Sequence, residues 1–430
     1  MPYTSPRLQL LRTCIALAFV GGAPAALAAP VAAVHEAAQA QQQGMLDTMR
    51  DLVGIESGSK DVEGVERIAV LIRDRLKALG GTVEIIQPTD VFRLDDTPEK
   101  VGPMVHAEFK GKGQKKIMLI AHMDTVYRNG MLKDQPFRID GDKAYGLGIA
   151  DDKHGVAAII HTLTLLQKLG FEDYGTITVL INGDEEISSP GARSTITRLG
   201  ADQDAVFSFE GGGAQARLTL ATSGIGAAYL TVQGKTSHAG ARPEGGVNAL
   251  YELAHQVLQL DKLSKPEEGL KLNWTVAQAG TNRNVIPGQA TAQADARALR
   301  VSDFDALSRT LEERIQKKLL PESKVSVKFE VRRPPLEATP ASRALAQHGV
   351  QIYKELDLPM TVVDRASGGG TDAAFAALKA RGPVIEGMGL SGFGAHSNDA
   401  EYIQINSIVP RLYLAARMIM DVSRDKAPMK

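Results

Sequence analysis

Three short apolar runs in this sequence are each followed at once by acidic or histidine side chains. The runs, which we interpret as buried strands, are Lys116–His122, Thr176–Ile181 and Ala205–Phe209. The side chains that end or follow them are His122, Asp124, Asp184, Glu185, Glu186 and Glu210. Ligands of open α/β sheets bind beyond the carboxyl ends of the strands, so this placement favours a binding or catalytic site.

The pair His122 and Asp124 fits a metal ligand and a carboxylate that supports it. Residues two apart in an extended segment point the same way, so Asp124 can accept the free ring N–H of His122 and fix its tautomer. A single pair of this kind is weak evidence for a metal, because a histidine and an aspartate at this spacing also occur without one.

A glycine-rich loop places Asp151 directly before a predicted helix over Val156–Leu169. Gly146 and Gly148 permit a tight backbone path at this point. The alternative interpretation of Asp151 is an ordinary helix N-cap followed by solvated charge. The loop matches neither the dinucleotide-binding glycine fingerprint nor a Walker loop, so it does not predict a phosphate site.

The remaining acids and a late histidine complete a plausible two-metal site. The run Asp184–Glu186 could be a solvated acidic turn, but three carboxylates at the end of a buried strand repel one another and call for a cation. With Glu210 and His396, the set offers two histidines, one bridging carboxylate and two terminal carboxylates for two Zn²⁺ ions. The adjacent Glu185 and Glu186 could divide the roles of metal ligand and general base.

The apolar pattern predicts an α/β fold in two domains. Strands alternate with helices up to about residue 223, which implies a mostly parallel sheet with helices on both faces. From 224 to 335, the order strand, helix, two strands, helix, strand is that of a small two-layer α+β domain. We therefore expect a discontinuous large domain over 41–223 and 336–430, with 224–335 inserted into it.

Composition is that of an ordinary globular protein with two domains. The chain has 430 residues, of which 43% are hydrophobic and 23% are charged, and its formal net charge is −1. This balance gives no reason to expect nucleic acid or a membrane surface as a partner.

Residues 1–28 have the pattern of a secretory signal peptide. Arg7 and Arg12 form a basic region, an apolar stretch begins at Cys14, and Ala26 and Ala28 supply the small residues of a cleavage site. A membrane anchor is the alternative, but the stretch is short and rich in glycine and proline. We therefore expect secretion, to the periplasm. Cys14 is the only cysteine, so any metal site of the mature chain must use His, Asp and Glu.

Eight segments, in order, resemble the motifs of the co-catalytic zinc metallopeptidases, the family of acetylornithine deacetylase, aminoacylase and peptidase T. The segments are His122–Val126, Gly146–Lys153, Asp184–Glu186, Ser208–Glu210, Gly234–Gly240, Asn284–Pro287, Gly368–Asp372 and Gly394–Ser397. The branch that they resemble most is carboxypeptidase G, which releases glutamate from folates. The resemblance implies a zinc-exopeptidase fold whose inserted domain is a dimerisation lid, and hence a homodimer.

The resemblance assigns a role to each acid and histidine by its position. The metal ligands would be His122 and Glu210 for one zinc ion, Glu186 and His396 for the other, and Asp151 as the bridge. Glu185 would be the general base, and Asp124 would orient His122. His238 of the lid would reach the partner protomer's site and stabilise the oxyanion, with Asn284 on the matching polar loop. Without the resemblance, His238 would be interpreted as a turn histidine.

Recognition of the released amino acid is expected from cations and backbone donors. The candidates are Arg217, Arg297, Arg333, Gly369, Gly370 and Thr371. An arginine fork suits an α-carboxylate, and a second cation would favour glutamate or aspartate. The alternative for each arginine is surface solvation or an ion pair within the lid.

Two departures from the family pattern affect the surroundings of the site. His154 stands where relatives usually have glycine, which would crowd the helix start, and Gly211–Ala214 is one residue shorter than its counterpart. The expected reaction is hydrolysis of the amide that joins an N-acyl or folyl group to a C-terminal glutamate. A broader N-acyl amino acid amidohydrolase or dipeptidase is the first alternative. An inactive homologue used for binding is the second, and the presence of Glu185 and all five ligands disfavours it.

Overall fold

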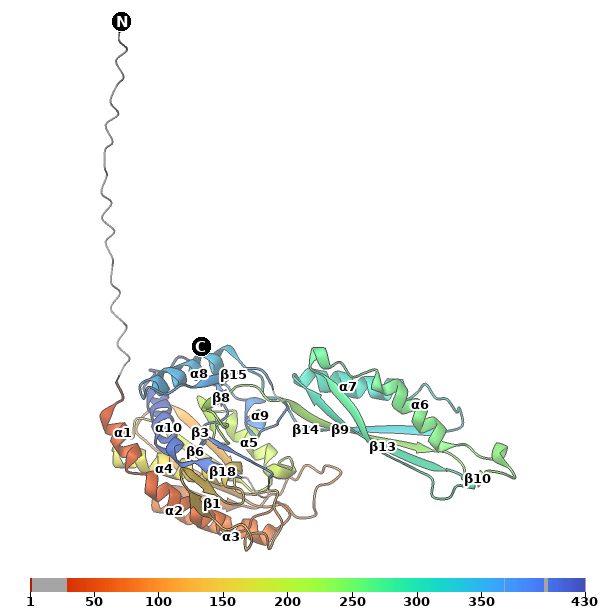
Figure 1. Cartoon of the computed structure of the whole chain (residues 1–430), viewed down its shortest axis with the longest axis horizontal. Helices are drawn as coiled ribbons and strands as arrows, with labels where there is room; N and C mark the ends of the chain where they lie inside the picture. The colour runs from red at the N-terminus through yellow and green to blue at the C-terminus, as the bar shows by residue number, and fades with distance from the viewer. Residues whose placement is uncertain (2–28, 367, 398–400, 430) are drawn as a thin grey trace.

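The computed structural model describes Met1 and residues 29–366, 368–397 and 401–429. The predicted signal peptide, apart from Met1, lies outside the described residues. Across the described part of the chain, no helix is both long and apolar enough to cross a membrane. The chain forms a larger body and a narrow, elongated body joined to it, as Figure 1 shows.

The larger body is built on a six-stranded sheet with the order β1-β2-β6-β3-β7-β16. The strands are β1 (Thr82–Ile86), β2 (Met104–Lys110), β3 (Lys116–His122), β6 (Thr176–Asn182), β7 (Ala205–Ser208) and β16 (Val384–Ile385). Strands β6, β3, β7 and β16 run parallel, whereas β2 pairs antiparallel with both β1 and β6. The predicted α/β class with a mostly parallel sheet is confirmed.

Helices cover both faces of this sheet because alternate residues of its buried strands point to opposite sides. Ile117 and Leu119 of β3 join a core with helices on one face, and Met118 and Ile120 join a separate core on the other. The helices of the first core are α1 (Ala32–Gln39), α2 (Gln42–Val53), α3 (Val62–Ala78), α4 (His154–Lys168), α8 (Pro340–Lys354) and α10 (Ile408–Ser423). Those of the second core are α5 (Arg193–Gly200) and α9 (Ala373–Ala377).

The elongated body is an antiparallel sheet of order β11-β13-β9-β14 packed against two helices. Its elements are β9 (Gly224–Gln233), α6 (Ala249–Asp261), β11 (Lys271–Ala279), β13 (Gln289–Ala298), α7 (Val301–Arg314) and β14 (Lys324–Arg333). The alanines at alternate positions of β13, from Ala290 to Ala298, are buried under the helices, while the intervening residues are more exposed. The short pair β10 (Ser237–His238) and β12 (Val285–Ile286) lies at its far end (Figure 1).

Two small sheets were not foreseen from the sequence. One has the order β17-β18-β5-β4 and is formed by Gly392–Phe393, Tyr402–Gln404, Lys143–Tyr145 and Arg138–Asp140. The other is a parallel pair of β8 (Arg217–Thr219) and β15 (Thr361–Val363). Because β18 pairs with β5, the first sheet brings the segment around His396 beside the loop that carries Asp151.

Candidate active site

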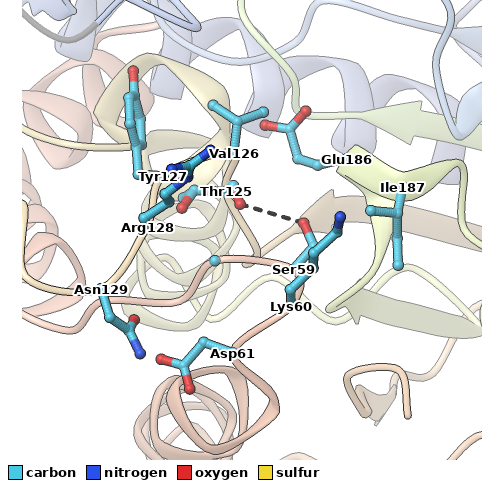
Figure 2. A pocket seen from close by; sticks show the side chains of 11 residues that line it. Ser59, Lys60, Asp61, Thr125, Val126, Tyr127, Arg128, Asn129, Glu186 and Ile187 are labelled. Carbon is cyan, nitrogen blue, oxygen red and sulfur yellow. Dashed lines mark hydrogen bonds between the residues drawn. The ribbon is translucent and has the colours of Figure 1, made fainter. Parts of the chain in front are cut away.

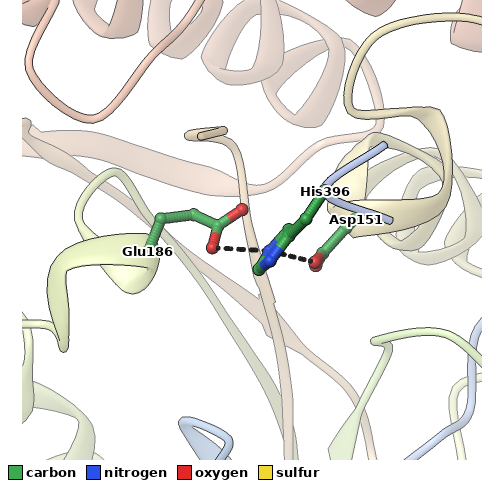
Figure 3. Close-up of side chains that lie close together, drawn as sticks. All are labelled: Asp151, Glu186 and His396. Carbon is green, nitrogen blue, oxygen red and sulfur yellow. Dashed lines mark hydrogen bonds and ion pairs between the residues drawn. The ribbon is translucent and has the colours of Figure 1, made fainter. Parts of the chain in front are cut away.

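Asp151 lies between two histidines that come from opposite ends of the sequence. Its Oδ1 is 3.0 Å from Nε2 of His122, and its Oδ2 is 3.2 Å from Nε2 of His396. The same nitrogen of His396 is 3.1 Å from Oε2 of Glu186, as Figure 3 shows. One carboxylate that offers a different oxygen to each of two histidines has the arrangement expected of a bridge between two cations.

The position of Asp151 follows from the loop that precedes α4. Gly148 has φ +73°, and a Cβ at this position would overlap the Cγ2 of Thr125, so the turn requires glycine. Asp151 itself has φ −155° and ψ 89°, outside the helical region, and α4 begins three residues later at His154. No side-chain capping bond is made at the start of α4, which excludes the N-cap interpretation of Asp151.

Glu210, at the carboxyl end of β7, belongs to the same group of acids. Its Oε1 is 3.3 Å from the hydroxyl of Thr371, which also hydrogen-bonds with Glu386. Burial, together with the charges of Glu386 and Glu185, raises the pKa of Glu210 well above its usual range. Protein groups alone therefore do not stabilise the ionised form of this side chain.

The donor set fits divalent cations. Asp151, Glu186 and His396 each present one ligand atom, and these atoms lie within 4.8 Å of one another. Oε1 of Glu186 is buried and has no hydrogen-bond partner in the described part of the chain. Buried charges in proteins are paired or coordinate metals, so a cation would supply the partner that this oxygen needs. Imidazole nitrogens and carboxylate oxygens in this combination are ligands that Zn²⁺ accepts.

Glu185, next to the ligand Glu186 in sequence, is paired with a buried arginine. Its Oε1 is 2.6 Å from Nη2 of Arg333, whose Nη1 donates to Oδ1 of Asp372 at 2.7 Å. Burial raises the pKa of Glu185 well above its usual range, and the charge of Arg333 opposes this rise. Arg333, predicted as a substrate-binding residue, is only 4% exposed and is paired with two carboxylates.

Asp124 connects the first histidine with both glutamates. Its carboxylate accepts the backbone N–H of Glu185 at 3.0 Å and that of Glu186 at 3.1 Å. Ser59 donates its hydroxyl to the same carboxylate at 2.7 Å. Nδ1 of His122 is 3.1 Å from the backbone carbonyl of Asp124 and 3.4 Å from its Oδ1. Asp124 is fully buried and therefore fixes the backbone of the two glutamates as well as the ring of His122.

The other predicted binding residues lie in three places. Arg297 pairs with Asp295 at 2.9 Å and donates to the carbonyl of Gly368 at 3.0 Å, so it reaches from β13 to the 368–370 loop. In that loop Gly370 contacts Arg333, and the carbonyl of Gly369 accepts from Ser223. Arg217 lies on β8 with its guanidinium against Gly213.

His238 and Asn284 lie together at the far end of the elongated body. His238 pairs with Val285 across β10 and β12, and the carbonyl of Asn284 accepts the N–H of Ala239 at 2.9 Å. Figure 1 places β10 at the end of this body that is remote from the central sheet. The structure does not bring either residue to the acidic group of the same chain.

A cavity of about 520 Å³ opens beside Glu186. Figure 2 draws its lining residues, which are Gly58, Ser59, Lys60, Asp61, Thr125, Val126, Tyr127, Arg128, Asn129, Glu186 and Ile187. Val126 and Ile187 give it an aliphatic part near Glu186. Lys60 and Arg128 are exposed and give it two cations.

Sequence reasoning gave no role to two residues that support the site. Ser59 lies in no recognisable pattern, and Asp372 ends the segment Gly368–Asp372, whose pattern does not indicate its pairing with Arg333. His154, expected to crowd the start of α4, is buried with its Nδ1 3.5 Å from Oδ1 of Asp152. Space for its ring exists because residue 389 is glycine, where a Cβ would overlap Nε2 of His154.

Comparison with protein families gives a match over most of the chain. The model described as peptidase family M20/M25/M40 matches residues 118–421. Carboxypeptidase G2 of Pseudomonas sp. (strain RS-16) is 46% identical over 394 residues, which cover 91% of this chain and 92% of that protein.

Solved structures give the same fold. A metallo-carboxypeptidase of the M20 family from Sulfolobus solfataricus superposes with a TM-score of 0.70 at 15% identity, covering 88% of this chain and 99% of the other. A dinuclear metal-binding peptidase of the M20 family from Bacillus subtilis superposes with a TM-score of 0.64 at 18% identity, covering 90% and 99%. At these identities the likeness establishes the architecture alone.

Proposed function

The chain belongs to peptidase family M20/M25/M40, and on this premise we propose that it is a zinc-dependent glutamate carboxypeptidase. The bond cleaved is the amide between an N-acyl or folyl group and a C-terminal glutamate. The observation that carries the proposal is the position of Asp151, with one oxygen toward His122 and the other toward His396. The 46% identity to carboxypeptidase G2 supports glutamate as the released amino acid.

Two Zn²⁺ ions would be held by five side chains of the acidic group. These are His122, Asp151, Glu186, Glu210 and His396. Zinc in such a site supplies a Lewis acid for the carbonyl and a nucleophile at neutral pH. Glu185 accepts a proton from the attacking water and returns it to the leaving amine, a role that suits a carboxylate with a raised pKa. Arg333 holds Glu185 in place, and Asp124 holds the backbone that carries it.

The orientation of the substrate is inferred from the residues that lie on either side of the proposed metal site. Glu185 pairs with Arg333, which lies against Gly370 of the 368–370 loop that Arg297 also contacts, whereas Glu186 pairs with His396 and lines the cavity. We place the glutamate half on the arginine side, where the partly exposed Arg297 is better positioned than the buried Arg333 to meet a carboxylate. The acyl half enters the cavity, whose volume is within the usual range of small-molecule sites.

The catalytic unit is proposed to be a homodimer. His238 is exposed at the end of the lid, the elongated body from Gly224 to Arg333, and it is remote from the acidic group of its own chain. A histidine in this position can act at a site of this kind only in a second copy of the chain. Secretion to the periplasm is proposed from the pattern of residues 1–28, and the N-terminal mass of protein recovered from the periplasm would test it.

Hydrolysis of matched substrates tests the proposed reaction. Folate and a set of N-acyl amino acids that differ only in the C-terminal residue would be compared by kcat/KM. Preferential release of glutamate is expected. Equal rates for glutamate, alanine and lysine would support the broader amidohydrolase instead. Activity that requires a free α-amine on the substrate would support a dipeptidase, and no hydrolysis of any member would support a binding protein.

A further inference from the structure

Glu401 is a buried carboxylate that lies outside the five proposed ligands and the proposed base. It stands immediately before β18 and is 4% exposed. Its Oε1 accepts the backbone N–H of Ala150 at 2.8 Å, and its Oε2 accepts that of Gly148 at 3.0 Å. The hydroxyl of Tyr127 donates to the same Oε2.

These contacts join three segments that carry proposed ligands. Gly148 and Ala150 belong to the loop that ends in Asp151, and Tyr127 follows the strand end that carries His122 and Asp124. The hydroxyl of Tyr127 is also 3.2 Å from the carbonyl of Ser397, the neighbour of His396. The pairing of β18 with β5 fixes the backbone on either side of the same contact.

We propose that Glu401 is a positioning residue for the metal centre, which sets the Asp151 loop against His122 and His396. This inference rests on the proposed function, since it concerns the same pair of zinc ions. The two N–H groups that Glu401 accepts are buried, and no other acceptor for them is found among the described residues. Without the carboxylate, the loop would move to satisfy them, because unpaired buried N–H groups are costly. Asp151 would then lose its place between the histidines.

Glu401→Gln tests the proposal because an amide presents only one acceptor oxygen and a donor group in place of the other. One of the two loop N–H groups must then face an NH₂ group. We expect the zinc affinity of the purified full chain to fall about 10–100-fold, the range typical of outer partners of metal ligands. Affinity would be measured by competition with a chromophoric chelator, and the melting temperature of the metal-free protein would be recorded in parallel.

Glu252→Gln is the matched control. Glu252 is also fully buried and also accepts two backbone N–H groups, from Leu319 at 3.2 Å and from Leu320 at 2.6 Å, but it lies in the lid core. This variant should bind zinc as the wild type does, even if it melts earlier. Tyr127→Phe, which removes one of the three bonds to Glu401, should weaken zinc binding less than Glu401→Gln does.

Each outcome has one meaning. Weakened zinc binding in Glu401→Gln alone supports the proposal. Unchanged zinc affinity in Glu401→Gln overturns it, and so does an equal loss in Glu252→Gln, since general destabilisation would then explain both. A wild-type protein that binds no zinc would instead overturn the proposed metal centre itself.

Discussion

Asp124 shows at the scale of single residues how consecutive side chains take different roles. Its carboxylate accepts the N–H groups of both Glu185 and Glu186, so it fixes the backbone from which the two side chains diverge. Glu186 then meets His396, while Glu185 meets Arg333. A fixed backbone therefore separates the proposed metal ligand Glu186 from the proposed proton acceptor Glu185, one residue away.

Glu185→Gln and Glu186→Gln should consequently fail in different ways. The first should lower kcat for glutamate release by about 10²–10⁴-fold, the range for loss of a general base, with zinc content unchanged. The second should lower zinc content as well as activity, because it removes a proposed ligand. Metal analysis by mass spectrometry beside steady-state kinetics would distinguish them, and zinc loss in Glu185→Gln would contradict the assignment of roles.

At the scale of elements, the loop before α4 depends on a left-handed glycine. Gly148→Ala should destabilise the protein by about 1–3 kcal/mol, because it adds backbone strain and an overlap with Thr125. Gly170→Ala is the matched control, since Gly170 has φ +61° but no atom within 4 Å of the position that an alanine Cβ would take. Urea unfolding should show the larger loss for Gly148→Ala, and equal losses would contradict the steric argument.

The packing of α2 on α4 includes a buried histidine that should make stability depend on pH. His161 lies between Gln41, 2.9 Å from its Nδ1, and Thr48, 2.9 Å from its Nε2. Burial lowers the pKa of His161 from 6.5 to about 4. Between these two values the unfolded chain binds a proton that the folded chain does not, so stability falls as pH falls.

This histidine should contribute up to about 1.4 kcal/mol of lost stability per pH unit across that interval. Urea unfolding from pH 7 to pH 4 would measure the slope. His161→Gln should reduce the slope over the same interval, and an unchanged slope in this variant would show that other groups cause it.

Strands could be predicted from the sequence where burial on both faces requires a continuous apolar run. The predicted strand Lys116–His122 has the same bounds as β3. A parallel strand covered on both faces is apolar at every position between its ends, which makes it easy to recognise. Strands β17 and β18 have two and three residues, too few for any period, so they were missed. Helix α1 was missed because its Ala- and Gln-rich sequence resembles a linker.

The candidate site, too, could be predicted only in part. The proposed ligands stand in motifs, and three of them, His122, Glu186 and His396, lie close to Asp151 in the structure. The pairing of Arg333 with Glu185 could not be predicted, because the two residues are 148 positions apart and meet only where β14 returns to the larger body. The bonds from Glu401 to the Asp151 loop likewise span about 250 residues, a separation that no local pattern records.

For the assembled protein, the proposed homodimer would build each site from residues of two chains. His238 is remote from its own chain's acidic group, so each proposed site would combine Glu185 of one chain with His238 of the other. A chain with His238→Ala and a chain with Glu185→Gln would therefore form one intact site when they pair. Each variant alone should be nearly inactive. Mixed after dissociation and reassociation, they should recover about a quarter of wild-type activity, since half of the dimers are mixed and each has one intact site. No recovery from proven mixed dimers would contradict a role for His238 in the partner's site.

One metal-restoration assay tests the proposed zinc-dependent release of glutamate. The purified protein would be assayed for free glutamate from folate before chelation, after chelation and after zinc is restored, with bound zinc measured each time. Release should disappear with the metal and return as about two zinc ions bind per chain. Release that persists in the metal-free protein, or no release from protein that holds both ions, would show that zinc does not drive glutamate release here.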